Sequence, residues 1–202
     1  MFSTAPLRTL SATALGLAAL VSVGCISAPG ATPDEKRQAI DESSDQTMQM
    51  IIADKGVTQQ QIMDAAGYAT ITNIGTQILV LGADDGYGVL VDNESGERTY
   101  LDVNSIDFGP GVGIAKYRTL LIFETKEKLD MFKNGEWEFG ADVAAVAKTG
   151  DGTGASAESS SSFDQDVDVY ITGEEGLAVS ANIRNMEVEI DRELSPDAPM
   201  DK

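Results

Sequence analysis

The spacing of hydrophobic positions changes from a helical to a strand period near Gly67. Before that point, Thr32-Pro33-Asp34-Glu35 has the order of a helix-capping box with proline at the first helical position. This predicts a helix over residues 33–54. The apolar residues that can share one of its faces are Ile40, Met48, Ile51 and Ile52. The stretch between Asp41 and Gln46 is polar, so that face is interrupted in its middle.

A second capping box, Thr58-Gln59-Gln60-Gln61, predicts a short helix that ends before Gly67. Gly67 suits the position just beyond a helix end, where a left-handed residue is common. A third helix is expected over residues 126–133, with Thr125 as its cap and Leu129 and Phe132 facing inward.

Alternating or compact apolar segments predict the strands. These segments span residues 68–74, 77–81, 87–91, 98–103, 115–123, 138–148, 167–171, 177–183 and 186–190. Asp92-Asn93-Glu94-Ser95-Gly96 has the composition of a hairpin turn, and residues 109–113 predict a kinked link. The Gly/Ser-rich stretch 149–162 favours a mobile loop or a long hairpin.

The order of these segments predicts an α+β fold that is mostly β. Two N-terminal helices precede an antiparallel β-sheet or barrel-like domain, which carries one inserted helix. We expect four regions: a lipoprotein signal peptide at 1–24, a lipidated tether at 25–32, the domain at 33–194 and a disordered tail at 195–202.

The first 24 residues have the composition of a secretory signal. Arg8 is followed by an apolar run over residues 12–23, which is too short to cross a bilayer, and small Gly24 precedes the cysteine. A cysteine directly after such a cut indicates a bacterial lipoprotein with an acylated Cys25, the alternative being a plain signal peptide with an incidental cysteine. Ile26 after the cysteine favours the outer membrane, facing the periplasm.

The composition of the chain excludes several kinds of partner and catalytic group. The 202-residue chain has a formal net charge of −19, which opposes binding to nucleic acid and simple attraction to anionic membranes. Its acidity also fits plain solubility. The chain has no histidine and one cysteine, so it lacks the usual general base and the commonest metal ligand. We therefore expect a non-enzyme with no cofactor and no metal.

Four cations are candidate lipid-binding residues. Lys36 and Arg37 follow the expected anchor and can meet headgroups, or form helix pairs with the acids beside them. Lys116 and Arg118 alternate on one strand, where they form either a binding patch or an ordinary solvated face.

Trp137 and Phe139 alternate on another expected strand. They are ligand-binding candidates, although large aromatic residues at such positions are more often core anchors. One strand face carries three carboxylates, Asp164, Asp166 and Asp168. They are candidates for a Ca²⁺ site or for the acid pair of a glycosidase, but a solvated surface is the simpler interpretation.

Several segments together resemble the SYLF domain, a family with lipid-binding and yeast actin-binding members. The matching segments are Ala-Ala-Gly-Tyr-Ala at 65–69, Gly-Tyr-Gly-Val-Leu at 86–90, Leu129 to Phe132 followed by Gly-Glu-Trp-Glu-Phe-Gly-Ala-Asp at 135–142, and the Gly-Leu turn at 173–177. The similarity covers about residues 34–194. At 75–79 the chain has Gly-Thr-Gln-Ile-Leu where the family has Gly-Lys-Gly-Gly, so phosphoinositide recognition is not expected.

The resemblance implies a lipid-binding or protein-binding module. Together with Cys25 it favours an exported, membrane-anchored lipoprotein with a non-catalytic lipid-binding domain. The alternative is a structural or interaction protein of the envelope that binds another protein or itself rather than lipid. A carboxylate hydrolase is a third and weaker hypothesis. Expected partners are the membrane, through acylated Cys25, and a phospholipid or another envelope component.

Overall fold

A computed structural model describes residues 27–134, 146–148, 154–156, 166–173, 178–180 and 183–198. Its helices are α1 (Pro33–Lys55), α2 (Gln59–Asp64) and α3 (Lys126–Lys133). Its strands are β1 (Gly67–Asp92), β2 (Arg98–Phe123), β3 (Val146–Lys148), β4 (Gly154–Ser156), β5 (Val167–Gly173), β6 (Ala178–Ser180) and β7 (Ile183–Ile190). This arrangement confirms the α+β class with two leading helices and an inserted one.

Both capping boxes are formed as the sequence predicts. The Thr32 side chain accepts a hydrogen bond from the Glu35 amide, and the Glu35 carboxylate accepts one from the Thr32 amide. Thr58 and Gln61 make the same reciprocal pair at the start of α2. Since each box satisfies amides that have no partner inside the helix, the local sequence is enough to set both helix starts.

Gly67 has a different role from the predicted one. Helix α2 ends at Asp64, Ala65 is extended, and Gly67 is the first residue of β1. A Cβ atom at Gly67 would lie 2.5 Å from the Val91 carbonyl oxygen and 2.8 Å from Leu129 Cδ1. The glycine is therefore needed for close packing inside the sheet and not for ending the helix.

The strands β1 and β2 are longer than the sequence predicts, because each merges shorter expected strands into one of 26 residues. They pair antiparallel from Gly67 opposite Phe123 to Val91 opposite Arg98, with one register irregularity between Leu79 and Leu81. The expected link at 109–113 lies inside β2: residues 111–113 take part in this pairing, and residues 109 and 110 fall where the register shifts. Backbone hydrogen bonds hold the ladder through stretches where side-chain alternation fades, and alternation was the signal used for prediction.

The hairpin turn between β1 and β2 falls where it was predicted. Gly96 has a φ of +72° and its amide donates to the Asp92 carbonyl. The Asp92 carboxylate accepts hydrogen bonds from the amides of Glu94 and Ser95, both 3.0 Å long. Its other oxygen accepts one from Lys126 Nζ at 2.9 Å, which joins the turn to α3.

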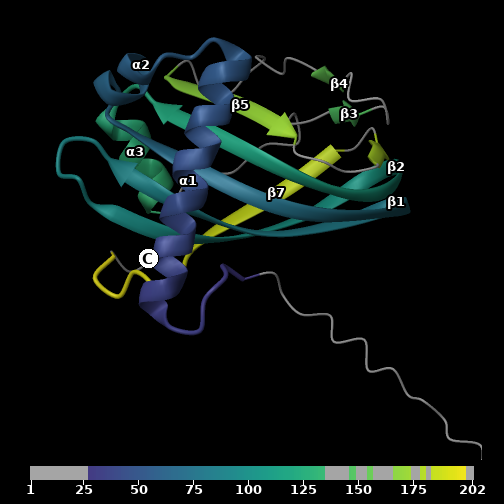
Figure 1. Ribbon diagram of the computed structural model, residues 1–202, viewed down its shortest axis with the longest axis horizontal. Coiled ribbons are helices and arrows are strands. Elements are labelled where there is room, and N and C mark those ends of the chain that lie inside the picture. The colour runs from purple at the N-terminus through teal and green to yellow at the C-terminus, as the bar shows by residue number, and fades with distance from the viewer. Residues whose placement is uncertain are drawn as a thin grey trace, which may run out of the picture.

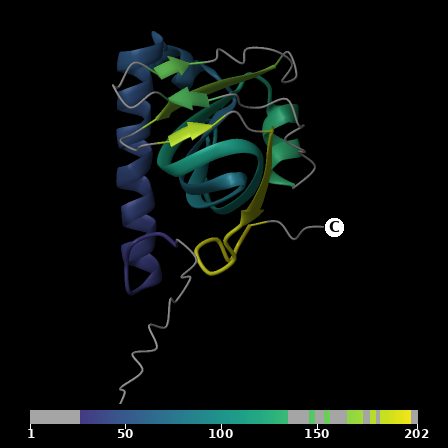
Figure 2. The same cartoon turned by 90° about the vertical axis from the view of Figure 1, so that its right-hand side faces the viewer.

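The β1–β2 ribbon curls over on itself (Figure 2). A Cβ atom at Gly86 would lie 2.5 Å from the Thr72 carbonyl oxygen, and one at Gly88 would overlap the carbonyl of Thr70. The two halves of β1 therefore cross with backbone almost touching backbone. Glycine allows this approach because it has no side chain to separate them.

Strand β2 is the centre of the sheet in the described residues. It pairs with β1 on one edge and, along its length, with β7, β6 and β5, always antiparallel. Strand β3 pairs with β6 and β4. Strand β4 lies within 149–162, the stretch predicted as a loop or a long hairpin, and its antiparallel pairing with β3 agrees with the hairpin alternative for Gly154–Ser156.

Helices α1 and α3 lie on opposite sides of the curled sheet (Figures 1 and 2). One hydrophobic core lies on the α1 side and includes Ile40, Ile51, Leu120 and Ile122. The other lies on the α3 side, where Phe123 meets Phe132 with ring centroids 5.0 Å apart. The inward positions predicted for Leu129 and Phe132 are confirmed.

The two ends of the domain are packed rather than loose where the structure describes them. Ala28, within the expected tether, is 6% exposed and shares the α1-side core with Leu194. Ser195, within the expected tail, is buried, and its hydroxyl accepts a hydrogen bond from the Tyr100 amide at 2.7 Å. The packed part of the chain therefore extends beyond the predicted boundaries at both ends.

We expect Gly86→Ala to destabilise the protein by about 1–3 kcal/mol or more, because its Cβ meets the Thr72 carbonyl where backbone has no room to move. Urea denaturation followed by circular dichroism measures this. Glu94→Ala, on the exposed turn, is the control and should change little. Equal stabilities for the two variants would contradict the close crossing.

Asp92 should make stability depend on acid pH. Hydrogen bonding to the Ser95 amide, with Lys126 nearby, lowers the pKa of Asp92 from 3.8 to about 2. A carboxyl whose pKa is lowered on folding stabilises the protein above about pH 4, and loses that effect as the pH falls through about 2. Asp92→Asn should therefore cost about 1–2 kcal/mol at pH 7, and the difference from the parent should shrink between pH 4 and 2. A pH-independent difference in urea denaturation would contradict this origin.

Candidate functional site

The middle of α1 buries polar side chains against the sheet. Ser43, Ser44 and Thr47 are buried between the apolar contacts of Ile40 and Ile51. The polar interruption noted in the sequence is therefore part of the buried face. A polar group on the sheet must face these residues of α1, because buried hydroxyls and carbonyls need hydrogen-bond partners.

Arg118 on β2 is that group. It is 2% exposed. Its Nη1 donates to the Ser43 carbonyl at 2.9 Å and to Thr47 Oγ1 at 3.0 Å, and its Nη2 donates to Gln46 Oε1 at 3.1 Å. Thr72 on β1 completes the group through a 2.9 Å bond to the Ser43 hydroxyl. Arg118 therefore joins α1 to the sheet and does not lie on a solvated face.

Lys116 lies two residues earlier on the same strand face and is half-buried. The predicted pair of basic residues therefore does not form an exposed patch. Strand alternation correctly places Lys116 and Arg118 on one side of β2, but alternation alone does not say that α1 covers that side.

Lys36 and Arg37 are engaged within the protein. Lys36 Nζ lies 3.0 Å from Glu193 Oε2, and Arg37 Nε donates to the Leu194 carbonyl at 3.0 Å. Arg37 also forms a pair with Asp34, one turn away, at 2.6 Å, which is the local helix pair that was the alternative interpretation. These contacts join the start of α1 to the C-terminal turn.

Several predicted residues lie outside the described residues: Cys25, Trp137, Phe139 and Asp164. Asp166 precedes β5 and is half-buried, and Asp168 on β5 is exposed. Within the described ranges, no three acidic, cysteine or histidine side chains gather closely enough to hold a metal ion. The described part of the chain also contains no helix long and apolar enough to span a bilayer.

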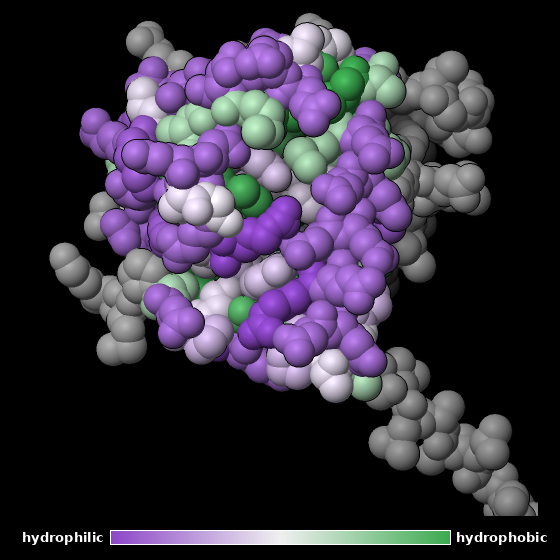
Figure 3. Space-filling model, turned by 60° about the vertical axis from the view of Figure 1, so that its left-hand side comes forward, coloured by the Kyte–Doolittle hydropathy of each residue, from purple (hydrophilic) through white to green (hydrophobic). Residues whose placement is uncertain are grey.

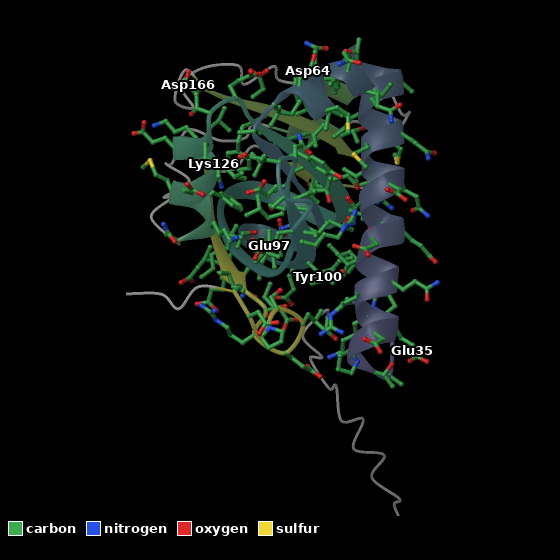
Figure 4. The ribbon with its side chains drawn as sticks, turned by 90° about the vertical axis from the view of Figure 1, so that its left-hand side faces the viewer. Glu35, Asp64, Glu97, Tyr100, Lys126 and Asp166 are labelled. Carbon is green, nitrogen blue, oxygen red and sulfur yellow. The ribbon has the colours of Figure 1, made fainter. Side chains whose placement is uncertain are left out.

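A cluster of ionisable groups lies between α1 and β2, near Tyr100 in Figure 4. Arg98 Nη1 lies 3.1 Å from Asp41 Oδ1, and the Tyr100 hydroxyl is 3.3 Å from Asp41 Oδ2. Burial raises the pKa of Asp41 above 3.8, although Arg98 opposes the rise. Burial, then the charge of Asp41, raises the pKa of Tyr100. These groups bond to one another and fasten the first half of α1.

The inner face of the ribbon carries polar residues that sequence reasoning did not single out. Asn73, Asp84 and Ser105 are all buried, and Asp84 lies opposite Ser105 in the β1–β2 ladder. Asn73 packs on Gly86, and the Asp84 carboxylate packs on Gly75. The side-chain amide of Asn73 and the hydroxyl of Ser105 have no hydrogen-bond partner among the residues that the structure describes. Groups of this kind are commonly satisfied by ordered water.

The outer face of the ribbon is covered at one end and uncovered at the other. At Val89 and Tyr100, which are paired, α1 and its core cover it. Farther along, Ala83 pairs with Ile106 and Leu81 lies two residues from Ala83 on the same face. Leu81 is 56% and Ile106 52% exposed. We call Leu81, Ala83 and Ile106 the outer patch.

The outer patch contrasts with the face in Figure 3, which is mainly hydrophilic and shows hydrophobic residues in small separate areas. The sequence placed Leu81 at the end of a compact apolar run, a pattern that usually indicates burial. Only the position of α1 shows which apolar residues on this sheet face remain exposed.

The chain is similar to Beta cell expansion factor A from Aeromonas veronii, with 28% identity over 164 residues. The match covers 81% of this chain and 60% of the relative, so the chain spans about three fifths of that protein's length. No family model matches the chain.

We expect Arg118→Leu to lower the free energy of unfolding by about 2–4 kcal/mol, because it leaves buried acceptors on α1 without a donor. Guanidinium denaturation measures the loss. Lys36→Met removes a partly exposed ion pair and should cost about 1 kcal/mol or less. Similar losses for both variants would mean that the buried network does not hold α1.

Proposed function

We propose that this chain is an exported lipoprotein, anchored through acylated Cys25 at the outer membrane facing the periplasm, whose domain binds lipid and carries out no catalysis. The first 24 residues and the cysteine that follows support the anchor. The resemblance to the SYLF domain over about residues 34–194 supports the binding role. The long match to Beta cell expansion factor A is compatible with a shared domain.

The outer patch is the observation that carries the binding role. Two large apolar side chains more than half exposed on neighbouring strands are a favourable contact for acyl chains or for another apolar surface. Lys36, Arg37 and Arg118 are engaged in contacts within the protein, and the chain has a net charge of −19. Lipid binding by this domain should therefore depend on apolar contact and not on attraction between cations and headgroups.

Four of the described groups with shifted pKa values have structural partners, which supports a non-catalytic role. Asp92 and Lys126 join the hairpin turn to α3, and Asp41 and Tyr100 fasten α1. Each of these four side chains is hydrogen-bonded to a partner that gives it a structural role. A catalytic acid or base, in contrast, must be able to reach the substrate.

A second candidate is an envelope interaction protein that uses the same outer patch to bind a protein. The patch lies on a sheet face, and an exposed sheet face is also a common protein-binding surface. The two candidates differ in what covers Leu81 and Ile106, and one experiment separates them.

That experiment is co-sedimentation of the mature Cys25→Ala chain with vesicles. We expect binding to phosphatidylcholine vesicles that does not weaken when salt is raised, because the contact is apolar. Changing both Leu81 and Ile106 to Ser should weaken binding at least about tenfold, since each removes apolar area worth roughly 1 kcal/mol or more.

Met63→Ser is the matched control, because Met63 is 59% exposed but lies on α2, away from the outer patch. It should leave binding unchanged. Absence of binding to vesicles with and without phosphatidylglycerol would reject the lipid role and favour the protein partner. Binding that falls steeply with salt would reject the apolar mode.

A further inference from the structure

The expected lipid attachment point is very close to the packed domain. Ala28 is buried in the α1-side core, and it is three residues from Cys25. Three residues extend at most about 11 Å, even when fully stretched. An acyl-anchored Cys25 must therefore keep Ala28 within about that distance of the bilayer surface.

Ala28 belongs to an end of the domain that is built from both chain termini. Leu194 shares its core, and Leu194 is held by Arg37 from the first turn of α1. The amides of Glu193 and Leu194 both donate to the Asp191 carboxylate, which fixes the C-terminal turn. We call this region, the first turn of α1 with residues 191–198, the anchor end.

The opposite end of the molecule is far away. Helix α1 has 23 residues and therefore rises about 34 Å from the anchor end towards α2. Figure 1 shows the C-terminal turn beside the start of α1, and α2 at the other end of that helix. A tether of about 11 Å cannot bring α2 to the surface while the anchor end stays away from it.

We propose that the anchor end rests on the bilayer and that α2 points away from it, with the short link to Cys25 holding the anchor end at the surface. This inference rests on the proposed function, because it requires the acylated cysteine. The Tyr100 amide donates to Ser195 of the anchor end, and Ile106 is six residues farther along β2. The outer patch is thus held within about 20 Å of the anchor end.

Electrostatic attraction does not produce this orientation. The acidic residues of the anchor end are Asp34, Glu35, Asp191, Glu193 and Asp197, against the basic residues Lys36, Arg37 and Arg192. This excess of negative charge is repelled by anionic headgroups. Tether length is therefore the factor that holds the anchor end at the surface, and a longer tether should release it.

The test uses the acylated protein in phosphatidylcholine vesicles that contain a headgroup-nitroxide lipid. Cys25 is the only cysteine in the chain, so an introduced cysteine is the only free thiol once Cys25 is acylated. Asp197→Cys places a fluorophore at the anchor end, and Met63→Cys places one on α2. Both positions are exposed.

We expect the nitroxide to quench the label at 197 and to leave the label at 63 unquenched. Inserting ten Gly/Ser residues after Ile26 gives the link a reach of roughly 17 Å beyond its present length, and should abolish the difference. Equal quenching at the two sites in the natural chain, or stronger quenching at 63, would overturn the orientation while leaving membrane anchoring intact. A protein that does not float with vesicles would overturn the proposed function as well.

Discussion

The structure depends on one buried cation, Arg118, that joins α1 to the sheet. An isolated guanidinium inside a protein costs several kcal/mol, so its position is tolerated because α1 supplies a carbonyl, a hydroxyl and an amide oxygen in the right places. These directional bonds set where α1 sits along the ribbon, since sliding the helix by one turn would break them. The position of α1 in turn decides which part of the sheet face is covered and leaves the outer patch exposed.

A second constraint is the self-crossing of the β1–β2 ribbon. Glycines at 75, 86 and 88 let the two halves of β1 approach until backbone meets side chain or backbone. This crossing creates two faces with different chemistry: an inner face with buried Asn73, Asp84 and Ser105, and an outer face that is apolar at Leu81 and Ile106. Because Lys36, Arg37 and Arg118 make contacts within the protein, the binding we propose relies on the apolar outer patch.

Prediction from sequence succeeded where the determining interactions are local. Capping boxes act over three residues, and the hairpin turn over five, so Thr32, Thr58 and Gly96 could be assigned their roles directly. It failed where the decisive contact comes from a distant segment. The candidate pair Lys116 and Arg118 was correctly placed on one strand face, but the helix residues that bond to Arg118 come more than seventy residues earlier. Leu81 shows the reverse case, since an apolar run predicts burial and yet Leu81 is 56% exposed.

The sequence by itself determined the helix starts, the hairpin turn, the α+β class and the expectation of an anchored exported protein, because each rests on a short motif or on composition. Tertiary structure alone decided that β1 and β2 are continuous, that Ala28 and Ser195 belong to the packed domain, and that the polar middle of α1 is its buried face. The physical reason is the range of the interactions. Hydrogen bonds within a turn depend on neighbouring residues, whereas burial depends on which surfaces meet after the whole chain has folded.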